Sequence, residues 1–314
     1  MRELYIVLKK KLMNKVGIAT QQVAAAFCGL EKGDRIMTVE EMSRQFNASR
    51  GTIQTTLSFL QQEGAIKLQP RGSLGTFITD LNLSLLLDIC DMNSLVGVMP
   101  LPYSKRYEGL ATGISTSMNK GKMRTSLVFS RGADNRLEGI LEQRYDFAVV
   151  SRLAAEHYVE KQYPIVIAHN FGPHTYVDQH ALVTCRNGVN LKAQDFSNCR
   201  IGVDEASTDQ RILSHRFFRD TQVTYVPIVY NQVIPALKGN DIDATIWNAD
   251  ALDARKNGIF SFPLEQISQD DTEAAIIHLA GKPFISRILA ELLNPDEVLE
   301  YQKKVMAGAC MPQY

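Results

Sequence analysis

Several absences limit what kind of protein this sequence encodes. No run of about 18 apolar residues is present among the 314 residues, so we expect no membrane-spanning helix and no membrane partner. The N-terminus lacks a long apolar stretch followed by a small-residue cleavage site, so we expect no signal peptide and a cytoplasmic location. No Walker motif, nucleophile elbow or HExxH motif occurs, and we predict neither a cofactor nor a metal site.

Cysteine and histidine are also sparse and poorly spaced for metal binding. The five cysteines are scattered and none forms a CxxC motif: Cys28, Cys90, Cys185, Cys199 and Cys310. We expect free, mostly buried thiols. His169, His174 and His180 are close in sequence, but their spacing is not that of a helical metal pair, so we interpret them as surface or hinge residues.

The composition is that of a globular protein, and its charge is unevenly distributed. Apolar residues make up 45% and charged residues 22% of the chain, and the length suits two domains. The net charge is zero, yet residues 1–79 hold 11 of the 34 Lys and Arg residues and only 6 of the 34 Asp and Glu residues. A basic N-terminal segment suggests a polyanionic partner. Because Lys9, Lys10, Lys11 and Lys15 supply much of this charge, a solvated helix face is the alternative.

The N-terminal segment has the pattern of two short helices joined by a tight turn. Thr38 and Glu41 have the spacing of a capping box, which begins a helix. This helix ends near residues 47–48, a plausible turn, and Ser49 is a good N-cap for a second helix over residues 50–63. Two such helices form a helix-turn-helix.

The flanking residues extend this pattern to a winged helix-turn-helix. Apolar spacing predicts an earlier helix over residues 11–30, and Gly64 is expected to end the second helix of the pair. Two short strands follow, over residues 65–68 and 76–78, joined by a Gly- and Pro-rich turn at residues 70–75. A hairpin directly after the second helix is a wing.

This arrangement predicts a surface for double-stranded DNA, the operator of a regulator. With Ile53, Leu57 and Leu60 facing the core, the opposite face of the second helix carries Arg and Gln, which can read guanine and adenine. We predict DNA contacts from the helix, its caps and the wing: Thr38, Ser49, Arg50, Gly51, Thr52, Gln54, Thr55, Ser58, Arg71 and Ser73. The alternative is a small helical domain with a surface hairpin and no DNA role.

Residues 49–78 resemble the winged helix of the GntR family. The matching positions are Ser49, Arg50, Thr52, Ile53, Leu57, Glu63, Gly64, Gly75, Thr76 and Phe77. Gln54 stands where that family usually has a DNA-contacting Arg, and Lys67-Leu68 replaces a more basic pair. The longer wing is a further departure. The resemblance implies DNA binding and leaves the operator sequence open.

The remainder of the chain alternates strands and helices, which predicts an α/β domain with parallel sheets. Residues 237–244 repeat the pattern of residues 141–148: a helix end, a turn, an Asp and an apolar strand. We predict an N-terminal domain (1–80), an apolar linker (81–93) and a two-lobed effector domain (94–314). Lobe I is expected at about 94–180 and 275–314, and lobe II at about 181–274.

The two-lobed pattern resembles the type II periplasmic-binding-protein fold, which LysR-type regulators use as an effector domain. The whole chain, through Gly281–Pro295, resembles the YhfZ family of bacterial regulators. This resemblance implies transcriptional regulation and names no ligand.

A ligand is expected beyond the C-terminal strand ends, where the lobes face each other. The candidate residues are hydroxyl and charged side chains in those loops: Ser104, Ser130, Arg131, Ser151, Arg152, Ser207, Thr208, Asp209, Asn248 and Asp250. Because Arg131 and Arg152 can pair with a carboxylate or phosphate, we hypothesise a small anionic metabolite. The alternative is a set of ordinary polar loops.

The sequence therefore predicts a DNA-binding transcriptional regulator, not an enzyme, with a small-molecule effector. We expect a homodimer, because helix-turn-helix proteins gain affinity from two half-sites. The alternative is an enzyme on the same fold with an accessory winged helix, which would recruit Asp134, Asp204, Glu205 or Asp209. A pure solute-binding protein is disfavoured by the winged helix.

Overall fold

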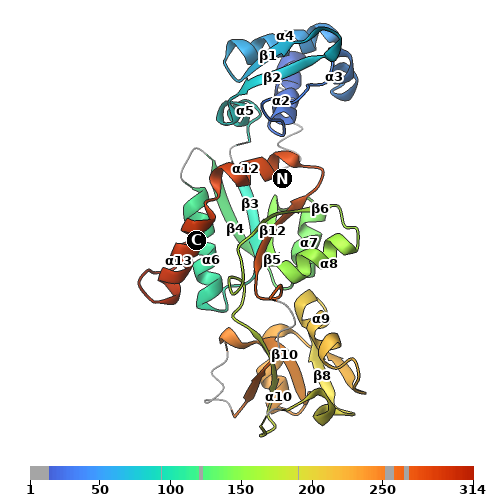
Figure 1. Ribbon diagram of the computed structural model, residues 1–314, viewed down its shortest axis with the longest axis vertical. Coiled ribbons are helices and arrows are strands. Elements are labelled where there is room, and N and C mark those ends of the chain that lie inside the picture. Colours follow the sequence, from blue (N-terminus) through green and yellow to red (C-terminus); the bar gives the residue numbers. More distant parts are fainter. Residues whose placement is uncertain (1–13, 93, 120–122, 190, 252–257, 265–268) are drawn as a thin grey trace. The chain divides into compact units, whose positions relative to one another are not determined.

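The computed structural model describes residues 14–92, 94–119, 123–189, 191–251, 258–264 and 269–314. The chain divides into two compact units (Figure 1). Of the described residues, the N-terminal unit contains 14–92, Ser94, 123–124 and 282–288, and the C-terminal unit contains the rest. Lys9, Lys10, Lys11 and the first residues of the helix predicted over 11–30 lie outside the described residues.

The N-terminal unit is a helical bundle with a two-stranded antiparallel hairpin. Its elements are α2 (Lys15–Phe27), α3 (Val39–Gln45), α4 (Arg50–Gln62), β1 (Ile66–Pro70), η1 (Gly72–Leu74), β2 (Thr76–Leu81) and α5 (Leu83–Ile89). The hairpin confirms the predicted wing, which turns through η1. The apolar linker residues extend β2 and form α5, whose Leu83, Leu86 and Leu87 are buried.

The predicted helix ends of the N-terminal unit are confirmed by their hydrogen bonds. Thr38 and Glu41 form a full capping box, in which the Thr38 amide donates to Glu41 Oε2 at 2.7 Å. Ser49 Oγ accepts from the Thr52 amide at 3.1 Å and begins α4. Asn47, between the helices, has φ 48°, and Gly64, after α4, has φ 74°, a left-handed conformation that glycine adopts without strain.

The buried face of α4 differs in one residue from the prediction. Ile53 and Leu60 are fully buried as expected, but Thr56 is buried and Leu57 is only half-buried. Thr56 tolerates burial because its hydroxyl lies 3.2 Å from that of Thr20 on α2, so the two polar groups satisfy each other.

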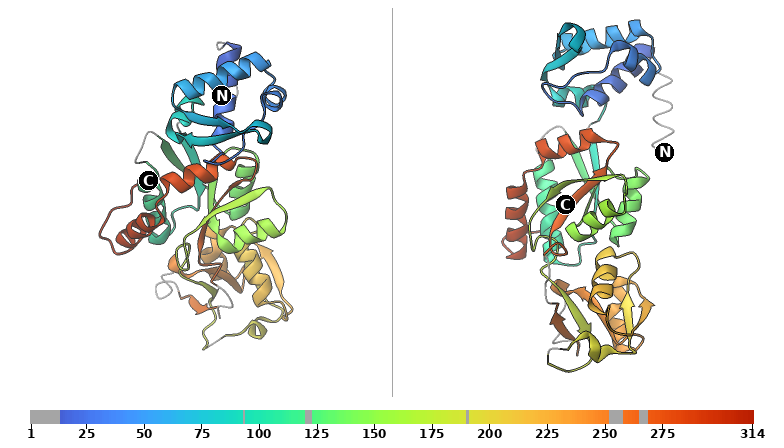
Figure 2. Two further views of the ribbon diagram at one scale, coloured as in Figure 1. Left: turned by 45° about the horizontal axis from the view of Figure 1, so that its top comes forward. Right: turned by 45° about the vertical axis from the view of Figure 1, so that its right-hand side comes forward.

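The C-terminal unit has two lobes, each built around a five-stranded sheet (Figure 2). Lobe I contains β3 (Ser94–Met99), β4 (Arg124–Phe129), β5 (Phe147–Ser151), β6 (Ile165–Asn170) and β12 (Ala274–Leu279). Lobe II contains β7 (His180–Thr184), β8 (Arg200–Val203), β9 (Thr224–Pro227), β10 (Ala244–Asn248) and β11 (Phe260–Pro263). The helices are α6 (Lys105–Met118), α7 (Ala133–Leu141), α8 (Arg152–Glu160), α9 (Thr208–Phe217), α10 (Val233–Lys238) and α13 (Pro295–Met306), with short turns η2 (Ala193–Phe196), η3 (Tyr230–Gln232) and η4 (Ala249–Ala251). Helix α12 (Pro283–Leu292) is divided between the units, since its residues up to Ile288 belong to the N-terminal unit.

The prediction of purely parallel sheets was wrong, because both sheets are mixed. The order in lobe I is β4-β3-β5-β12-β6, and β12 runs antiparallel to both β5 and β6. The order in lobe II is β11-β7-β10-β8-β9, and β7 runs antiparallel to β10 and β11. The strand before β7 in the chain is β6 of lobe I, and the strand before β12 is β11 of lobe II. Each reversed strand therefore enters its sheet from the other lobe, and no helical crossover within one sheet fixes its direction. The chain returns to the sheet of lobe I through β12.

Helices α6 and α13 lie side by side along one edge of lobe I (Figures 1 and 2). The close approach occurs at Gly109 and Gly113 of α6. A Cβ atom on Gly113 would lie 2.4 Å from the carbonyl oxygen of Val298 on α13. These glycines therefore set the distance between the two helices.

The described residues contain no helix long and apolar enough to cross a membrane. All five cysteines are free, but the prediction that most are buried was wrong: only Cys28 and Cys199 are. A hydrogen bond to Cys90, together with burial, raises the pKa of the Cys28 thiol far above its usual range.

Candidate functional site

The predicted DNA-contact residues lie on α4, its cap and the wing. Arg50, Gln54 and Thr55 are exposed, whereas Ile53 and Leu60 of the same helix are buried. Thr38, Ser49, Gly51, Ser58, Arg71 and Ser73 are also exposed, and Thr52 is half-buried with its hydroxyl 2.9 Å from that of Ser49. The first turns of α4 therefore present polar side chains on one open face.

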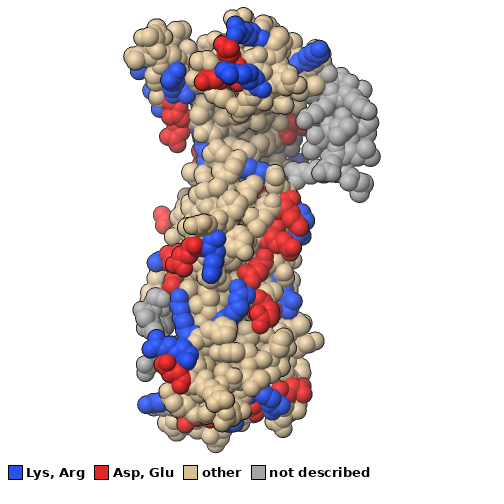
Figure 3. Space-filling view, turned by 90° about the vertical axis from the view of Figure 1, so that its right-hand side faces the viewer, with Lys and Arg blue, Asp and Glu red and all other residues tan. Residues whose placement is uncertain are grey.

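Two arginines of this surface have partners within the unit. Arg50 Nη2 lies 2.9 Å from Glu40 Oε2 on α3, and both side chains are largely exposed. The Arg71 guanidinium lies over the ring of Phe77 at 4.6 Å from its centre, which anchors the side chain to the wing. On the face shown in Figure 3, basic side chains of this unit lie beside acidic ones, so the basic surface is local rather than uniform.

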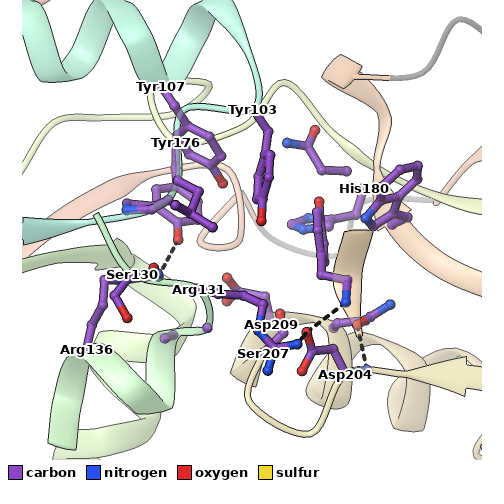
Figure 4. Close-up of a pocket in the computed structure, with 18 of the residues that line it drawn as sticks. Tyr103, Tyr107, Ser130, Arg131, Arg136, Tyr176, His180, Asp204, Ser207 and Asp209 are labelled. Carbon is purple, nitrogen blue, oxygen red and sulfur yellow. Dashed lines mark hydrogen bonds and ion pairs between the residues drawn. The ribbon is translucent and has the colours of Figure 1, made fainter. Parts of the chain in front are cut away.

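A cavity lies between the two lobes of the C-terminal unit. Its water-accessible volume is about 60 Å³. Lobe I and the segment that crosses from β6 to β7 line it with Pro100, Leu101, Tyr103, Tyr107, Ser130, Arg131, Gly132, Ala133, Arg136 and Tyr176. Lobe II lines it with His180, Asp204, Ser207, Asp209, Gln210, Tyr230, Ile246, Trp247 and Asn248. In Figure 4, Tyr103, Tyr107 and Tyr176 enter from above and Asp204, Ser207 and Asp209 from below.

Polar contacts join the lobes around this cavity. Arg131 Nη1 lies 3.0 Å from Asp204 Oδ2, and the Ser151 hydroxyl donates to Asp209 Oδ1. Asp134 of lobe I accepts from Arg211 Nη1 of lobe II at 2.9 Å. These contacts hold the two lobes together in the present structure.

Aromatic side chains form much of the cavity wall. The rings of Tyr103 and Tyr230 stack across the lobes with centres 5.8 Å apart, and Tyr230 also contacts Trp247 at 5.2 Å. Tyr107 and Tyr176 meet edge to face at 5.2 Å. Burial raises the pKa of Tyr176 to about 12, so its hydroxyl stays protonated at neutral pH.

Two carboxylates of lobe II differ in their environment. Asp204 accepts from the Tyr230 amide at 3.0 Å and the Ala206 amide at 3.1 Å, besides its ion pair with Arg131. Asp209 is buried, and this burial raises its pKa from 3.8 to about 6. Asp209 is therefore the more weakly stabilised anion of the two.

The predicted ligand residues separate into two groups. Five of them line the cavity: Ser130, Arg131, Ser207, Asp209 and Asn248. The other five do not: Ser104, Ser151, Arg152, Thr208 and Asp250. Arg152, for example, pairs with Glu156 at 2.7 Å and Glu273 at 2.9 Å, so its guanidinium forms ion pairs within lobe I.

The remaining four residues form helix caps, hydrogen bonds or ion pairs with other residues of the protein. Ser104 caps α6 through the Tyr107 amide, and Ser151 caps α8 through the Ala154 amide. The Thr208 hydroxyl donates to Asp134, and Asp250 pairs with Arg106 at 3.0 Å.

Sequence reasoning missed Arg136, the tyrosines and Trp247. Arg136 lies one turn inside α7 rather than in the preceding loop, and Tyr176 lies in the crossing segment, where no strand end marks it. The His-rich segment was interpreted as surface or hinge, yet His180 lines the cavity and its Nδ1 lies 2.7 Å from Asp271 Oδ2. The aromatic residues that follow strand ends, such as Tyr103, were the available signal.

These features define a class: a helix-turn-helix unit followed by a two-lobed α/β domain with a cavity between its lobes. This combination fits a DNA-binding regulator with a ligand-binding domain. Residues 31–78 match the family model of a helix-turn-helix domain, and residues 82–314 match that of the YhfZ C-terminal domain. The chain belongs to the YhfZ family. It is 32% identical over 314 residues to the uncharacterized protein YhfZ of Escherichia coli K12, covering 98% of this chain and 100% of that protein.

Solved structures agree with this fold. The crystal structure of YhfZ from Shigella flexneri has a TM-score of 0.62 and 34% identity, covering 73% of this chain and 97% of its own. The VFT2 domain of Bordetella pertussis BvgS has a TM-score of 0.51 and 10% identity, covering 71% and 97%. The alkanesulfonate-binding protein SsuA of Xanthomonas axonopodis pv. citri, solved with MOPS, has a TM-score of 0.50 and 14% identity, covering 69% and 79%. At these identities the last two show the fold alone.

Proposed function

We propose that this protein is a cytoplasmic transcriptional regulator that binds an operator through α4 and the wing and senses a small metabolite in its C-terminal domain. The observation that carries the proposal is the exposed N-terminal part of α4. Arg50, Gln54 and Thr55 are exposed there, whereas Ile53 and Leu60 on the opposite face of the helix are buried. Side chains at these positions of a recognition helix meet base edges in the major groove.

We assign one role to each predicted domain: residues 1–80 bind DNA, and residues 94–314 bind the effector. Arg50 and Arg71 supply phosphate or guanine contacts, and Gln54 suits adenine. A GntR-like winged helix acts as a homodimer on two half-sites about one helical turn apart. The helix-turn-helix and the YhfZ-family domain favour a regulator over an enzyme.

The metabolite is proposed to carry an anionic group. The support now comes from Arg136, whose side chain lies in the cavity wall without a carboxylate partner, rather than from Arg152. A ligand that contacts both lobes favours their closed arrangement, and any such preference couples effector and DNA affinity reciprocally.

The DNA-binding part of the proposal is tested by fluorescence anisotropy with a pool of genomic fragments at two salt concentrations. The wild-type protein is expected to select particular fragments, and Arg50→Ala and Gln54→Ala to weaken that binding roughly 10- to 100-fold. Arg219→Ala is the matched control, because it removes one exposed positive charge from the other unit. Equal, salt-sensitive binding to all fragments by wild type and variants would contradict the proposal.

A further inference from the structure

The cavity between the lobes holds two buried charged side chains without a salt-bridge partner among the described residues. They are Arg136 of α7 in lobe I, which is 2% exposed, and Asp209 of α9 in lobe II, which is 6% exposed. Moving an ion from water into the protein interior without a counter-ion costs roughly several kcal/mol of free energy. Such residues persist when a ligand supplies the missing charge.

Arg136 is only partly satisfied by its neighbours. Its Nη1 donates to the Ser130 carbonyl at 2.8 Å and its Nη2 to the Tyr176 hydroxyl at 2.9 Å, both neutral acceptors. Its Nε is buried and has no acceptor among the described residues. Trp247 Nε1, in the opposite wall, is likewise buried without an acceptor. These two donors therefore lack acceptors, which an anionic group on a ligand would provide.

Asp209, in contrast, lacks a positive partner and a donor for its second carboxylate oxygen among the described residues. Its Oδ1 accepts the Ser151 hydroxyl, and no described side chain donates to its Oδ2. Two basic groups act on Asp209 electrostatically, His180 and Arg136, but neither forms a hydrogen bond or ion pair with it among the described residues, and the His180 Nδ1 is held by Asp271. Arg131, the other guanidinium in the cavity wall, is paired with Asp204. A cationic group on a ligand is the missing partner.

The aromatic wall suits a cation as well. Tyr103 stacks on Tyr230, and the ring of Trp247 lies against Tyr230 at an interplanar angle of 59°. Ring faces attract ammonium groups. The volume of about 60 Å³ favours a small molecule.

We propose that the cavity binds a small zwitterion, with its carboxylate on Arg136 and its ammonium group on Asp209. The inference rests on the proposed function and specifies the sensed metabolite beyond an anion. Because α7 belongs to lobe I and α9 to lobe II, the two ends of one ligand bridge the lobes and stabilise their closed arrangement.

The test uses the full chain, dialysed at pH 7.5, with thermal unfolding as a screen and calorimetry for the compounds that shift the midpoint. The probes are the twenty common L-amino acids, β-alanine and 4-aminobutyrate. Each hit is compared with the matched acid that lacks the amine and the matched amine that lacks the acid. At least one zwitterion is expected to bind at least tenfold more tightly than either matched single ion.

Two variants assign the ends of the ligand. Asp209→Asn keeps the shape and the Ser151 contact, and is expected to weaken binding of the zwitterion roughly 10- to 100-fold while leaving the matched acid unchanged. Arg136→Met is expected to weaken both. Asp220→Asn, an exposed change of the same charge in lobe II, is the control and leaves affinity unchanged. Circular dichroism verifies that each variant is folded.

Failure of this inference is distinguishable from failure of the proposed function. If matched acids bind wild type and Asp209→Asn as tightly as the zwitterions do, the ligand is a simple anion, which overturns the zwitterion and leaves metabolite sensing intact. If no member of the panel binds, the zwitterion is also overturned. The DNA measurement is independent of both results.

Discussion

The guanidinium of Arg131, in the loop before α7, lies 3.0 Å from the carboxylate of Asp204, in the loop after β8. This ion pair connects the two lobes at the wall of the cavity that both residues line. The Asp204 side chain is almost fully buried, whereas one third of the Arg131 side chain is exposed. The same contact therefore contributes to stability and to closure of the ligand site.

A double-mutant cycle measures this contact. Arg131→Ala is expected to lower the free energy of unfolding, because it leaves a buried carboxylate with only backbone donors. Asp204→Asn and the double variant complete the cycle, with an expected coupling of about 1–2 kcal/mol by urea unfolding. Strictly additive effects would show that the two side chains do not interact in solution.

Asp209→Asn is expected to stabilise the ligand-free protein at neutral pH. Burial raises the pKa of Asp209 to about 6, so folding favours its protonated form. Its contribution to stability is therefore largest below about pH 4 and is lost as pH rises to about 6. Asparagine has no charge to bury, so the variant gains about 1–3 kcal/mol at pH 7.5 and little at pH 4.

The measurement is urea unfolding of both proteins at pH 4, 5, 6 and 7.5. A variant less stable than wild type at pH 7.5 would contradict the role given to burial. Greater stability combined with weaker zwitterion binding is the trade-off expected at a ligand site.

Glu40→Gln is expected to strengthen operator binding. Glu40 holds Arg50 in an exposed ion pair that must separate before Arg50 reaches DNA, and its own charge repels phosphate. Since exposed pairs contribute about 0–1 kcal/mol, the gain is roughly two- to fivefold in affinity by anisotropy. Glu31→Gln, an exposed change of the same charge in the same unit, serves as control. Weaker binding by Glu40→Gln would mean that the pair orients Arg50 for DNA.

Gly113→Ala is expected to destabilise the C-terminal unit. The added Cβ would meet the backbone of Val298, so α6 and α13 must separate at a cost of about 1–3 kcal/mol. Gly51→Ala, in α4, is the matched change in an uncrowded helix, where only Ser49 Oγ lies near the new atom, and it is expected to preserve stability. Thermal unfolding compares the two variants, and equal midpoints would contradict the close packing.

Local sequence patterns predicted the N-terminal unit well, because its signals lie within a few residues of each other. The capping box of Thr38 and Glu41, the N-cap Ser49 and the terminating Gly64 each act on their own helix. Strand direction in the C-terminal unit was not predictable in this way. The pairing of β12 with β5 joins Ala274 to Ser151, and nothing near either residue specifies that reversal.

The cavity was predicted only in part for the same physical reason. Loops after β4 and β8 supplied Arg131 and Ser207 as expected, because strand ends can be located from the sequence. Whether an arginine is free or paired depends on distant partners: Arg152 is occupied by Glu273, whereas Arg136 donates hydrogen bonds only to neutral groups. Tertiary contacts, not residue type, decide which arginine remains available for a ligand.

The central claim, that α4 reads DNA sequence, is tested most directly by selection from random duplexes with wild type and Gln54→Arg. Wild type is expected to enrich a motif with two half-sites, and Gln54→Arg to change the preferred base at one position of each half-site from adenine to guanine, with the rest of the motif retained. No enriched motif with wild type, or an unchanged motif with Gln54→Arg, would contradict the claim.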